Sequence, residues 1–345
     1  MHQQRKADHL RINLQEEVDV KQIATGFDQY RFTHCALPDC DLDEIDTSTA
    51  LLGKRLSAPL IISAMTGGTP EARDINHRLA EAAQDSDIGM GVGSQRAAIE
   101  DPALADTYRV RHIAPDILLM ANLGAIQLNY GYGPDECRRA VEMIEADALV
   151  IHLNPLQEAL QPEGDTRFTG LVHKIEAVCQ ASPVPVVVKE VGWGISEPVA
   201  RQLAEAGVAA IDTAGAGGSS WSQVEMHRAP NEHQRQVAAV FAEWGIPTLE
   251  SLLLSRRGAP HLPIIASGGI RDGIQIAKAI ALGAAACGIA GPFLHAADQS
   301  TAAVIDLTQV LLDQLRIAMF AVGAADIPAL TRHPPLRRNF SPDGF

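Results

Sequence analysis

Eight short apolar runs between residues 60 and 290 constrain the fold more than any other feature of the sequence. Each run is four to six residues long and apolar at successive positions, as strands buried on both faces of a parallel sheet require. The runs span residues 60–64, 88–92, 117–121, 148–151, 185–188, 209–214, 263–266 and 285–290. Amphipathic stretches between them predict helices, including residues 71–84, 135–145, 168–179, 197–205, 248–257 and 271–282, and residues 302–322 predict a last helix.

This alternation predicts an α/β protein with a closed (β/α)8 barrel, the TIM barrel fold. An open doubly wound sheet is the alternative. The first strand is followed by Met65-Thr66-Gly67-Gly68-Thr69, however, and not by the Gly-x-Gly-x-x-Gly turn typical of that fold. We expect one domain, 1–345. It has an N-terminal extension (1–58), the barrel (59–322) with a long insertion after the sixth strand (215–262), and a C-terminal tail (323–345).

The composition excludes several classes of protein. The chain carries 28 Lys and Arg against 42 Asp and Glu, a net charge of −14, and lacks a basic block with interleaved aromatic residues, so a nucleic-acid partner is not expected. Five cysteines without a Cys-x-x-Cys pair indicate free thiols in a reducing compartment. No stretch is apolar enough for a signal peptide or a membrane span. We therefore expect a cytoplasmic protein without a membrane partner.

Residues that can bind ligands follow every predicted strand. The active site of a (β/α)8 barrel lies at the C-terminal ends of its strands. Here these ends carry Met65-Thr66, Ser94-Gln95-Arg96, Asn122, His152, Lys189-Glu190, Thr213, Ser267-Gly268-Gly269-Ile270-Arg271 and Gly291. We expect them to share one site.

Two glycine-rich loops indicate a phosphate in that site. Residues 267–273 and 288–291 follow the seventh and eighth strands, where this fold usually binds phosphate. Their backbone N–H groups, and a helix that begins near Arg271, suit an anion. The alternative is that each loop only makes a tight turn, but the presence of both favours phosphate.

Three strand-end residues suit a flavin. Lys189 can place a positive charge against the electron-rich edge of the ring, or against an enolate. Asn122 and Thr66 can both donate and accept hydrogen bonds, as a uracil-like ring requires. The alternative for Lys189 is a structural ion pair with Glu190.

The run from Ile151 to Glu158, Ile-His-Leu-Asn-Pro-Leu-Gln-Glu, is the most unusual in the chain. His152 and Asn154 lie two residues apart at a strand end and so face the same way. Pro155 redirects the chain and leaves Gln157 and Glu158 above the opening. A single carboxylate there suits one Mg²⁺ better than a two-carboxylate hydrolase. A solvated loop acid and a core histidine are the alternative.

The N-terminal residues Arg5, Lys6 and His9 lie in a predicted helix, with Arg5 and His9 on one face. Together with Arg96 they can collect diphosphate oxygens from outside the barrel. The alternative is an ordinary solvated charged helix.

Taken in order, these segments resemble the type II isopentenyl diphosphate isomerases, which are FMN-binding (β/α)8 proteins. The resemblance runs from the N-terminus to Gly291. It rests on residues 5–9, 32–38, 63–68, 93–96, 151–158, 188–194, 212–221 and 267–273. Met-Thr-Gly-Gly, Ser-Gln-Arg and His-Leu-Asn-Pro-Leu-Gln-Glu are together specific. One departure is Ser219, which stands where the family has threonine and which keeps the hydroxyl.

The resemblance implies a role for each matching residue. FMN would be bound by Ser63, Ala64, Met65, Thr66, Ser94, Asn122, Lys189, Thr213, Ser219, Gly269, Ile270, Arg271, Ala290 and Gly291. Substrate would be bound by Arg5, Lys6, His9, Ser94, Gln95, Arg96 and Gln157. Catalysis would involve Gln157, His152 and Asn154, and Glu158 would bind Mg²⁺.

The implied reaction moves a proton from C2 of isopentenyl diphosphate to C4, which gives dimethylallyl diphosphate. The reaction would use reduced FMN and Mg²⁺, and NADPH or NADH would serve only to reduce the flavin. The resemblance also implies that the protein is a homo-oligomer, either a tetramer or an octamer. Two alternatives stay open. An FMN oxidoreductase of 2-hydroxy acids needs an Arg/His pair beside the flavin, and the late loops show no clear one. The other alternative is a non-catalytic phosphate-binding barrel.

Overall fold

Eight parallel strands form a closed barrel in the computed structural model, which describes residues 2–332 and 334–338. The strands are β4 (Leu60–Ile62), β5 (Gly89–Gly91), β6 (Leu119–Gly124), β7 (Ala148–His152), β8 (Val186–Lys189), β9 (Ala210–Asp212), β10 (Ile264–Ser267) and β11 (Ala286–Ile289). Each strand pairs with the next, and β11 closes the barrel by placing Cys287 opposite Leu60. All eight lie within or next to the predicted apolar runs. The predicted (β/α)8 fold is confirmed.

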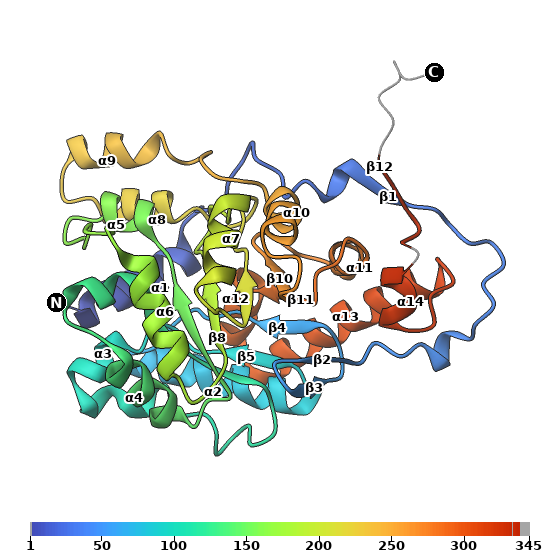
Figure 1. The fold of residues 1–345 in the computed structure, drawn as a ribbon, viewed down its shortest axis with the longest axis horizontal. Helices are drawn as coiled ribbons and strands as arrows, with labels where there is room; N and C mark the ends of the chain where they lie inside the picture. Colours follow the sequence, from blue (N-terminus) through green and yellow to red (C-terminus); the bar gives the residue numbers. More distant parts are fainter. Residues whose placement is uncertain (1, 333, 339–345) are drawn as a thin grey trace.

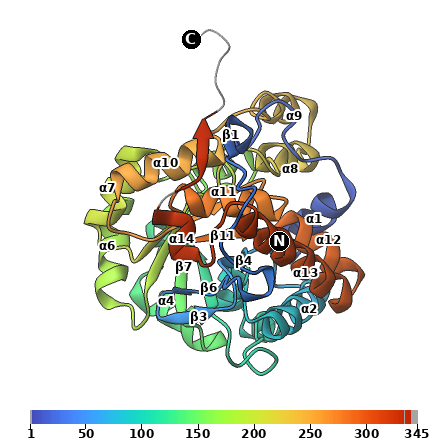
Figure 2. The same cartoon turned by 90° about the vertical axis from the view of Figure 1, so that its right-hand side faces the viewer.

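Helices surround the barrel, as its end-on view shows (Figure 2). The main ones are α2 (Pro70–Ser86), α4 (Pro134–Ile144), α6 (Leu171–Ala181), α7 (Glu197–Glu205), α10 (Thr248–Gly258), α11 (Gly273–Ala281) and α13 (Thr301–Phe320). These helices correspond to the seven predicted helical stretches. α11 begins at Gly273 and not at Arg271, because the Asp272 carboxylate accepts the N–H of Gln275 at 2.8 Å and caps the helix.

Successive strand residues are apolar because both faces of each strand are buried. In β7, Leu149 and Ile151 pack outward against the helices, whereas Ala148 and Val150 point into the barrel. The same alternation of directions applies in the other strands, since side chains on a strand alternate between its two faces. Two apolar layers therefore hold the barrel, one inside it and one under the helices.

A hairpin closes the N-terminal end of the barrel. It pairs β2 (Thr49–Leu51) with β3 (Lys54–Leu56) through Leu52 and Gly53, which both have positive φ, as a tight two-residue hairpin turn requires. Leu51 and Leu56 pack among the residues inside the barrel. Because this end is filled, a ligand site has to lie at the opposite end.

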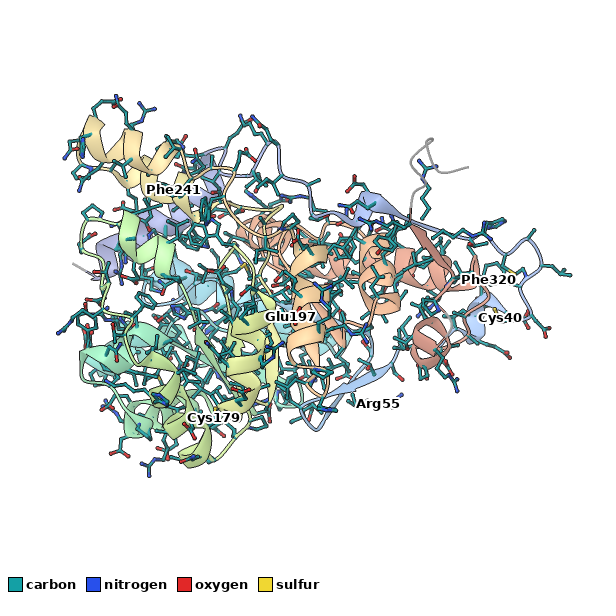
Figure 3. All side chains as sticks on the ribbon, turned by 45° about the horizontal axis from the view of Figure 1, so that its top comes forward. Cys40, Arg55, Cys179, Glu197, Phe241 and Phe320 are labelled. Atoms are coloured by element: carbon teal, nitrogen blue, oxygen red, sulfur yellow. The ribbon has the colours of Figure 1, made fainter. Side chains whose placement is uncertain are left out.

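Shorter elements lie around that opposite end, which is on the left in Figure 1. They are α1 (His2–Gln15), α3 (Arg96–Glu100), α5 (Pro155–Leu160), α8 (Trp221–Arg228), α9 (Glu232–Ala239) and α12 (Gly291–Gln299), with the 3-10 helices Pro102–Thr107 and Ala125–Tyr130. The predicted insertion supplies α8, α9 and α10. In Figure 3, Phe241, just after α9, marks this end, and Cys40 and Phe320 mark the other.

The predicted tail differs from expectation. It contains α14 (Ile327–Arg332) and β12 (Leu336–Arg338), and β12 pairs with β1 (Tyr30–Phe32) of the N-terminal extension. Unlike the barrel strands, these two short segments, Tyr-Arg-Phe and Leu-Arg-Arg, are not continuous apolar runs, and three residues are too few to show an alternating pattern. Two 3-10 helices, Phe27–Gln29 and Leu42–Glu44, complete the extension. Residues 339–345 of the tail lie outside the described residues. No helix in the described part has the length and apolar character that a membrane span needs.

Candidate active site

A cavity of about 240 Å³ opens at the C-terminal end of the barrel. All eight strand ends contribute to its lining, together with α1 and the insertion. The predicted site residues that line it are Arg5, Lys6, His9, Ser63, Ala64, Met65, Thr66, Ser94, Arg96, Asn122, His152, Asn154, Gln157, Glu158, Lys189, Ser219, Gly269, Ile270, Arg271, Ala290 and Gly291. The structure therefore brings nearly the whole predicted set together.

Gln95 and Thr213 lie outside the cavity lining. The Gln95 side chain donates to the Ala140 carbonyl at 2.8 Å and accepts the N–H of Asn122 at 2.9 Å. Thr213 is fully buried, and its hydroxyl accepts the N–H of Ser267 at 3.3 Å. Both side chains hold neighbouring strand ends together, and this geometry gives no support to direct ligand contact.

Bare backbone forms one end of the cavity. A Cβ atom on Gly269, whose φ is +70°, would lie 2.2 Å from the carbonyl oxygen of Gly217, so only glycine fits there. Ser219 and Arg271 flank this backbone, and both contact the carboxylate of Asp19. Exposed N–H groups, a hydroxyl and a guanidinium together suit a phosphate.

The side chains on the barrel axis fit a flavin. Lys189 lines the cavity, and its Nζ donates to the Glu190 carbonyl oxygen at 2.7 Å. The Glu190 carboxylate instead accepts hydrogen bonds from the backbone N–H groups of residues 191–193 at 2.6–2.7 Å. The alternative, an ion pair between the side chains of Lys189 and Glu190, therefore does not form. The buried Ser63 Oγ, also in the lining, has no hydrogen-bond partner among the described residues. A polar ligand would satisfy it.

His152 is a neutral imidazole with a defined tautomer. The Asn122 amide donates to the Val92 carbonyl at 3.1 Å, which turns its Oδ1 toward His152 Nδ1 at 2.8 Å. Nδ1 is therefore the protonated nitrogen. Burial, followed by the charges of Lys189, Lys6 and Arg5, lowers the pKa of His152 to about 3. The ring thus offers Nε2 as a hydrogen-bond acceptor.

The Gln157 amide is held from two sides. Asn154 Nδ2 donates to its Oε1 at 3.2 Å, and its Nε2 donates to Glu225 Oε1 at 3.1 Å. The same Glu225 oxygen lies 3.0 Å from His9 Nε2. Burial raises the pKa of Glu225, but the bond from His9 and the charges of His9 and Arg228 outweigh it and hold the pKa below its ordinary value.

Sequence reasoning missed Glu225. It lies in α8 of the insertion, 68 residues from Gln157, and does not follow a strand. No motif marks it, and only the fold brings it to Gln157 and His9.

Glu158 and Asn154 present oxygen atoms suited to a hard cation. Glu158 is buried, so it is not a solvated loop acid. Its Oε1 accepts a hydrogen bond from Asn154 Nδ2 at 3.0 Å. Its Oε2 accepts hydrogen bonds from the Asp165 N–H at 2.7 Å and from the Gln161 side chain. Asn154 Oδ1 is buried and has no partner within the described chain. Among the described residues, no group of three His, Cys, Asp or Glu side chains could hold a metal ion, so a cation at Glu158 and Asn154 would need further ligands from water or from a bound ligand.

Three basic side chains line the same cavity as this carboxylate. Arg5 and Lys6 reach the cavity from α1, and Lys6 Nζ donates to the Ser94 carbonyl oxygen at 3.4 Å. Burial, followed by the charge of Arg5, lowers the pKa of Lys6 to about 8. Arg96 Nη1 pairs with Asp165 at 3.0 Å. The alternative of a solvated helix is wrong for the face of α1 that carries Arg5, Lys6 and His9.

Comparison of sequences gives close relatives over nearly the whole chain. The family of FMN-dependent dehydrogenases matches residues 2–111 and 152–336. An isopentenyl-diphosphate delta-isomerase from Nostoc sp. is 54% identical, covering 97% of this chain and 96% of its own. One from Synechocystis sp. is 56% identical, with 96% and 95% covered. One from Stutzerimonas stutzeri is 56% identical, with 94% of each covered.

Solved structures with a similar fold are more distant in sequence. A mutant of (S)-mandelate dehydrogenase has a TM-score of 0.71 at 20% identity, covering 98% of this chain and 97% of that one. A mutant of flavocytochrome b2 with pyruvate bound has a TM-score of 0.69 at 16% identity, covering 96% of this chain and 82% of that one. At these identities the likeness shows the fold alone.

Proposed function

The chain belongs to the FMN-dependent dehydrogenase family and, within it, to the isopentenyl-diphosphate delta-isomerases, and from this premise we propose its reaction. It interconverts isopentenyl and dimethylallyl diphosphate by a 1,3-allylic proton shift that uses reduced FMN and Mg²⁺. NADPH or NADH serves only to reduce the flavin. The single-domain organisation, the homo-oligomer and the cytoplasmic location remain predictions.

One observation carries this proposal: a single cavity holds two separate anion-binding regions. The backbone around Gly269, with Ser219 and Arg271, forms one of them. Arg5, Lys6 and Arg96 form the other, beside Glu158. The first region suits the FMN phosphate. The second suits a diphosphate, and Glu158 and Asn154 beside it would hold Mg²⁺.

The flavin ring lies between these regions in our proposal. Lys189 and Asn122 would hold its polar edge, residues 64–66 and 290–291 would contact it, and Ser63 Oγ would gain a hydrogen-bond partner. Reduced FMN supplies a proton donor and acceptor, and an electron-rich ring, for an alkene that no side chain in the cavity is acidic enough to protonate.

The chain's own residues bind and orient the substrate. Gln157, fixed between Asn154 and Glu225, holds the reacting end of the allyl unit in place. Because His152 is neutral, the diphosphate is held by the charges of Lys6, Arg5 and Arg96. α1 covers the cavity and limits water access during the proton shift.

The oxidoreductase of 2-hydroxy acids is less well supported. Such an enzyme needs an Arg/His pair beside the flavin. Among the described residues, the histidines that line the cavity are His9 and His152, and neither comes from the loops after β9, β10 or β11.

The experiment that tests the proposal starts from the visible spectrum of the purified protein with added FMN. Reduction and addition of Mg²⁺ and isopentenyl diphosphate should then give dimethylallyl diphosphate. Conversion of 2-hydroxy acids with O₂ uptake, and no isomerised product, would favour the alternative.

A further inference from the structure

We propose that Asp165 is a positioning residue that fixes the Mg²⁺ carboxylate, Glu158, relative to the diphosphate arginine, Arg96. This inference rests on the function proposed above for the two residues. Asp165 lies between α5 and α6, away from every strand end.

Asp165 joins three separate segments of the cavity wall. Its Oδ2 accepts from Arg96 Nη1 at 3.0 Å and from Gln127 Nε2 at 3.3 Å. Its backbone N–H donates to Glu158 Oε2 at 2.7 Å. One residue thus contacts α3, the 3-10 helix after β6, and α5. A shift of Asp165 has to change the Glu158–Arg96 spacing.

The loop before Asp165 is pressed onto α5. A Cβ atom on Gly164 would lie 1.7 Å from the carbonyl oxygen of Glu158, so only glycine allows this approach. The Gly164 N–H also donates to the Gln161 carbonyl at 3.1 Å. This close contact holds the Asp165 N–H within hydrogen-bond distance of Glu158. The hydrogen bond between them therefore depends on the path of the loop backbone.

The Arg96 guanidinium is held at two points. Glu100 accepts from its Nε at 2.8 Å, and Asp165 accepts from its Nη1. The side chains of Arg96 and Asp165 are only 21% and 19% exposed, so this ion pair is less screened than one at the surface. With two of its N–H groups engaged, the guanidinium has a fixed plane and presents its other N–H groups to a ligand. Fixing the plane in advance lowers the ordering cost of binding a diphosphate.

The test compares Asp165→Asn with a matched control, Glu100→Gln, in the FMN-loaded protein. Both variants remove one carboxylate charge from Arg96. Asp165→Asn keeps the backbone N–H that donates to Glu158, but it loosens the loop that carries this N–H from Arg96, whereas Glu100→Gln leaves that loop untouched. Two quantities are measured by calorimetry: the Kd of inorganic pyrophosphate at saturating Mg²⁺, and the Mg²⁺ concentration that gives half-maximal pyrophosphate binding.

Asp165→Asn should raise the pyrophosphate Kd about tenfold and also raise the half-saturating Mg²⁺ concentration. Glu100→Gln should raise the Kd by less and leave the Mg²⁺ requirement unchanged. The FMN Kd should be unchanged in both. Equal effects of the two variants, or a wild-type Mg²⁺ requirement in Asp165→Asn, would overturn the proposal. If Asp165→Asn does not fold, Asp165→Glu, which keeps the charge and lengthens the side chain, should show the same raised Mg²⁺ requirement.

These binding measurements do not depend on turnover. If the wild-type protein binds magnesium pyrophosphate but does not isomerise isopentenyl diphosphate, the proposed function is wrong and the proposed role of Asp165 is unaffected. If the enzyme is active but Asp165→Asn changes neither the pyrophosphate Kd nor the half-saturating Mg²⁺ concentration, the proposed role of Asp165 is wrong and the proposed function is unaffected.

Discussion

Asp19, in the N-terminal extension, forms an ion pair with Arg271, which lies 252 residues later in the loop after β10. The other oxygen of Asp19 accepts from Ser219 Oγ at 3.0 Å. The backbones of residues 18–20 and 218–220 also pair, through bonds of 2.8 and 2.9 Å. The carboxylate therefore engages the two side chains that we assign to the FMN phosphate.

A serine hydroxyl donates only one hydrogen bond, and a carboxylate repels a phosphate nearby. Asp19→Asn should therefore lower the FMN Kd several-fold. Riboflavin, which lacks the phosphate, should bind both proteins equally. Fluorescence titrations with the two flavins measure this difference. An equal change for FMN and riboflavin, or weaker FMN binding, speaks against competition between Asp19 and the phosphate.

Lys6 should give the reaction an alkaline limit. Its pKa is lowered to about 8, so the side chain is charged below pH 8 and loses its charge as the pH rises through that value. We expect kcat/KM for the diphosphate to fall above about pH 8. Lys6→Arg, which stays charged, should remove this limb of the profile. An identical alkaline limb in the variant would assign it to another group.

Lys189 and Arg5 should separate cofactor binding from substrate binding. Lys189→Ala should weaken FMN binding, whereas Arg5→Ala should raise the KM for the substrate and leave the FMN Kd unchanged. Loss of one charged contact corresponds to roughly 1.5–3 kcal/mol, or about 10- to 150-fold. If both variants weakened FMN equally, the division of the cavity into two anion-binding regions would be wrong.

Glu158→Gln should keep FMN bound but lose most activity, because an amide is a poorer Mg²⁺ ligand than a carboxylate. Raising the Mg²⁺ concentration should restore part of the rate. The initial rate is measured as a function of Mg²⁺ for wild type and variant. Superimposable curves would remove Glu158 from the metal site.

The sequence predicted the barrel because burial on both faces makes each strand a nearly continuous apolar run, as in residues 263–266, most of which lie in β10. It predicted most of the site because parallel strand ends meet at one edge. Glu225, Asp165 and Asp19 escaped prediction since they lie in an insertion, a loop and the N-terminal extension, which only tertiary contacts bring to the cavity.

Gln95 and Thr213, predicted to bind substrate and FMN, lie outside the cavity lining. Both stand at strand ends, as ligand-binding residues in this fold do, but their side chains turn between the strands. Position along a strand fixes the edge on which a residue lies. It does not fix whether a neighbouring backbone group takes up the side chain's hydrogen bonds.

The number of reductant equivalents consumed per product tests the central claim most directly. An isomerase needs reductant only to activate FMN, whereas an oxidoreductase passes two electrons for every product. Oxidation of NADPH or dithionite is counted anaerobically against dimethylallyl diphosphate formed, over many turnovers. We predict a ratio far below one. A strict one-to-one ratio, or no isomerised product with fully reduced FMN, would contradict the account.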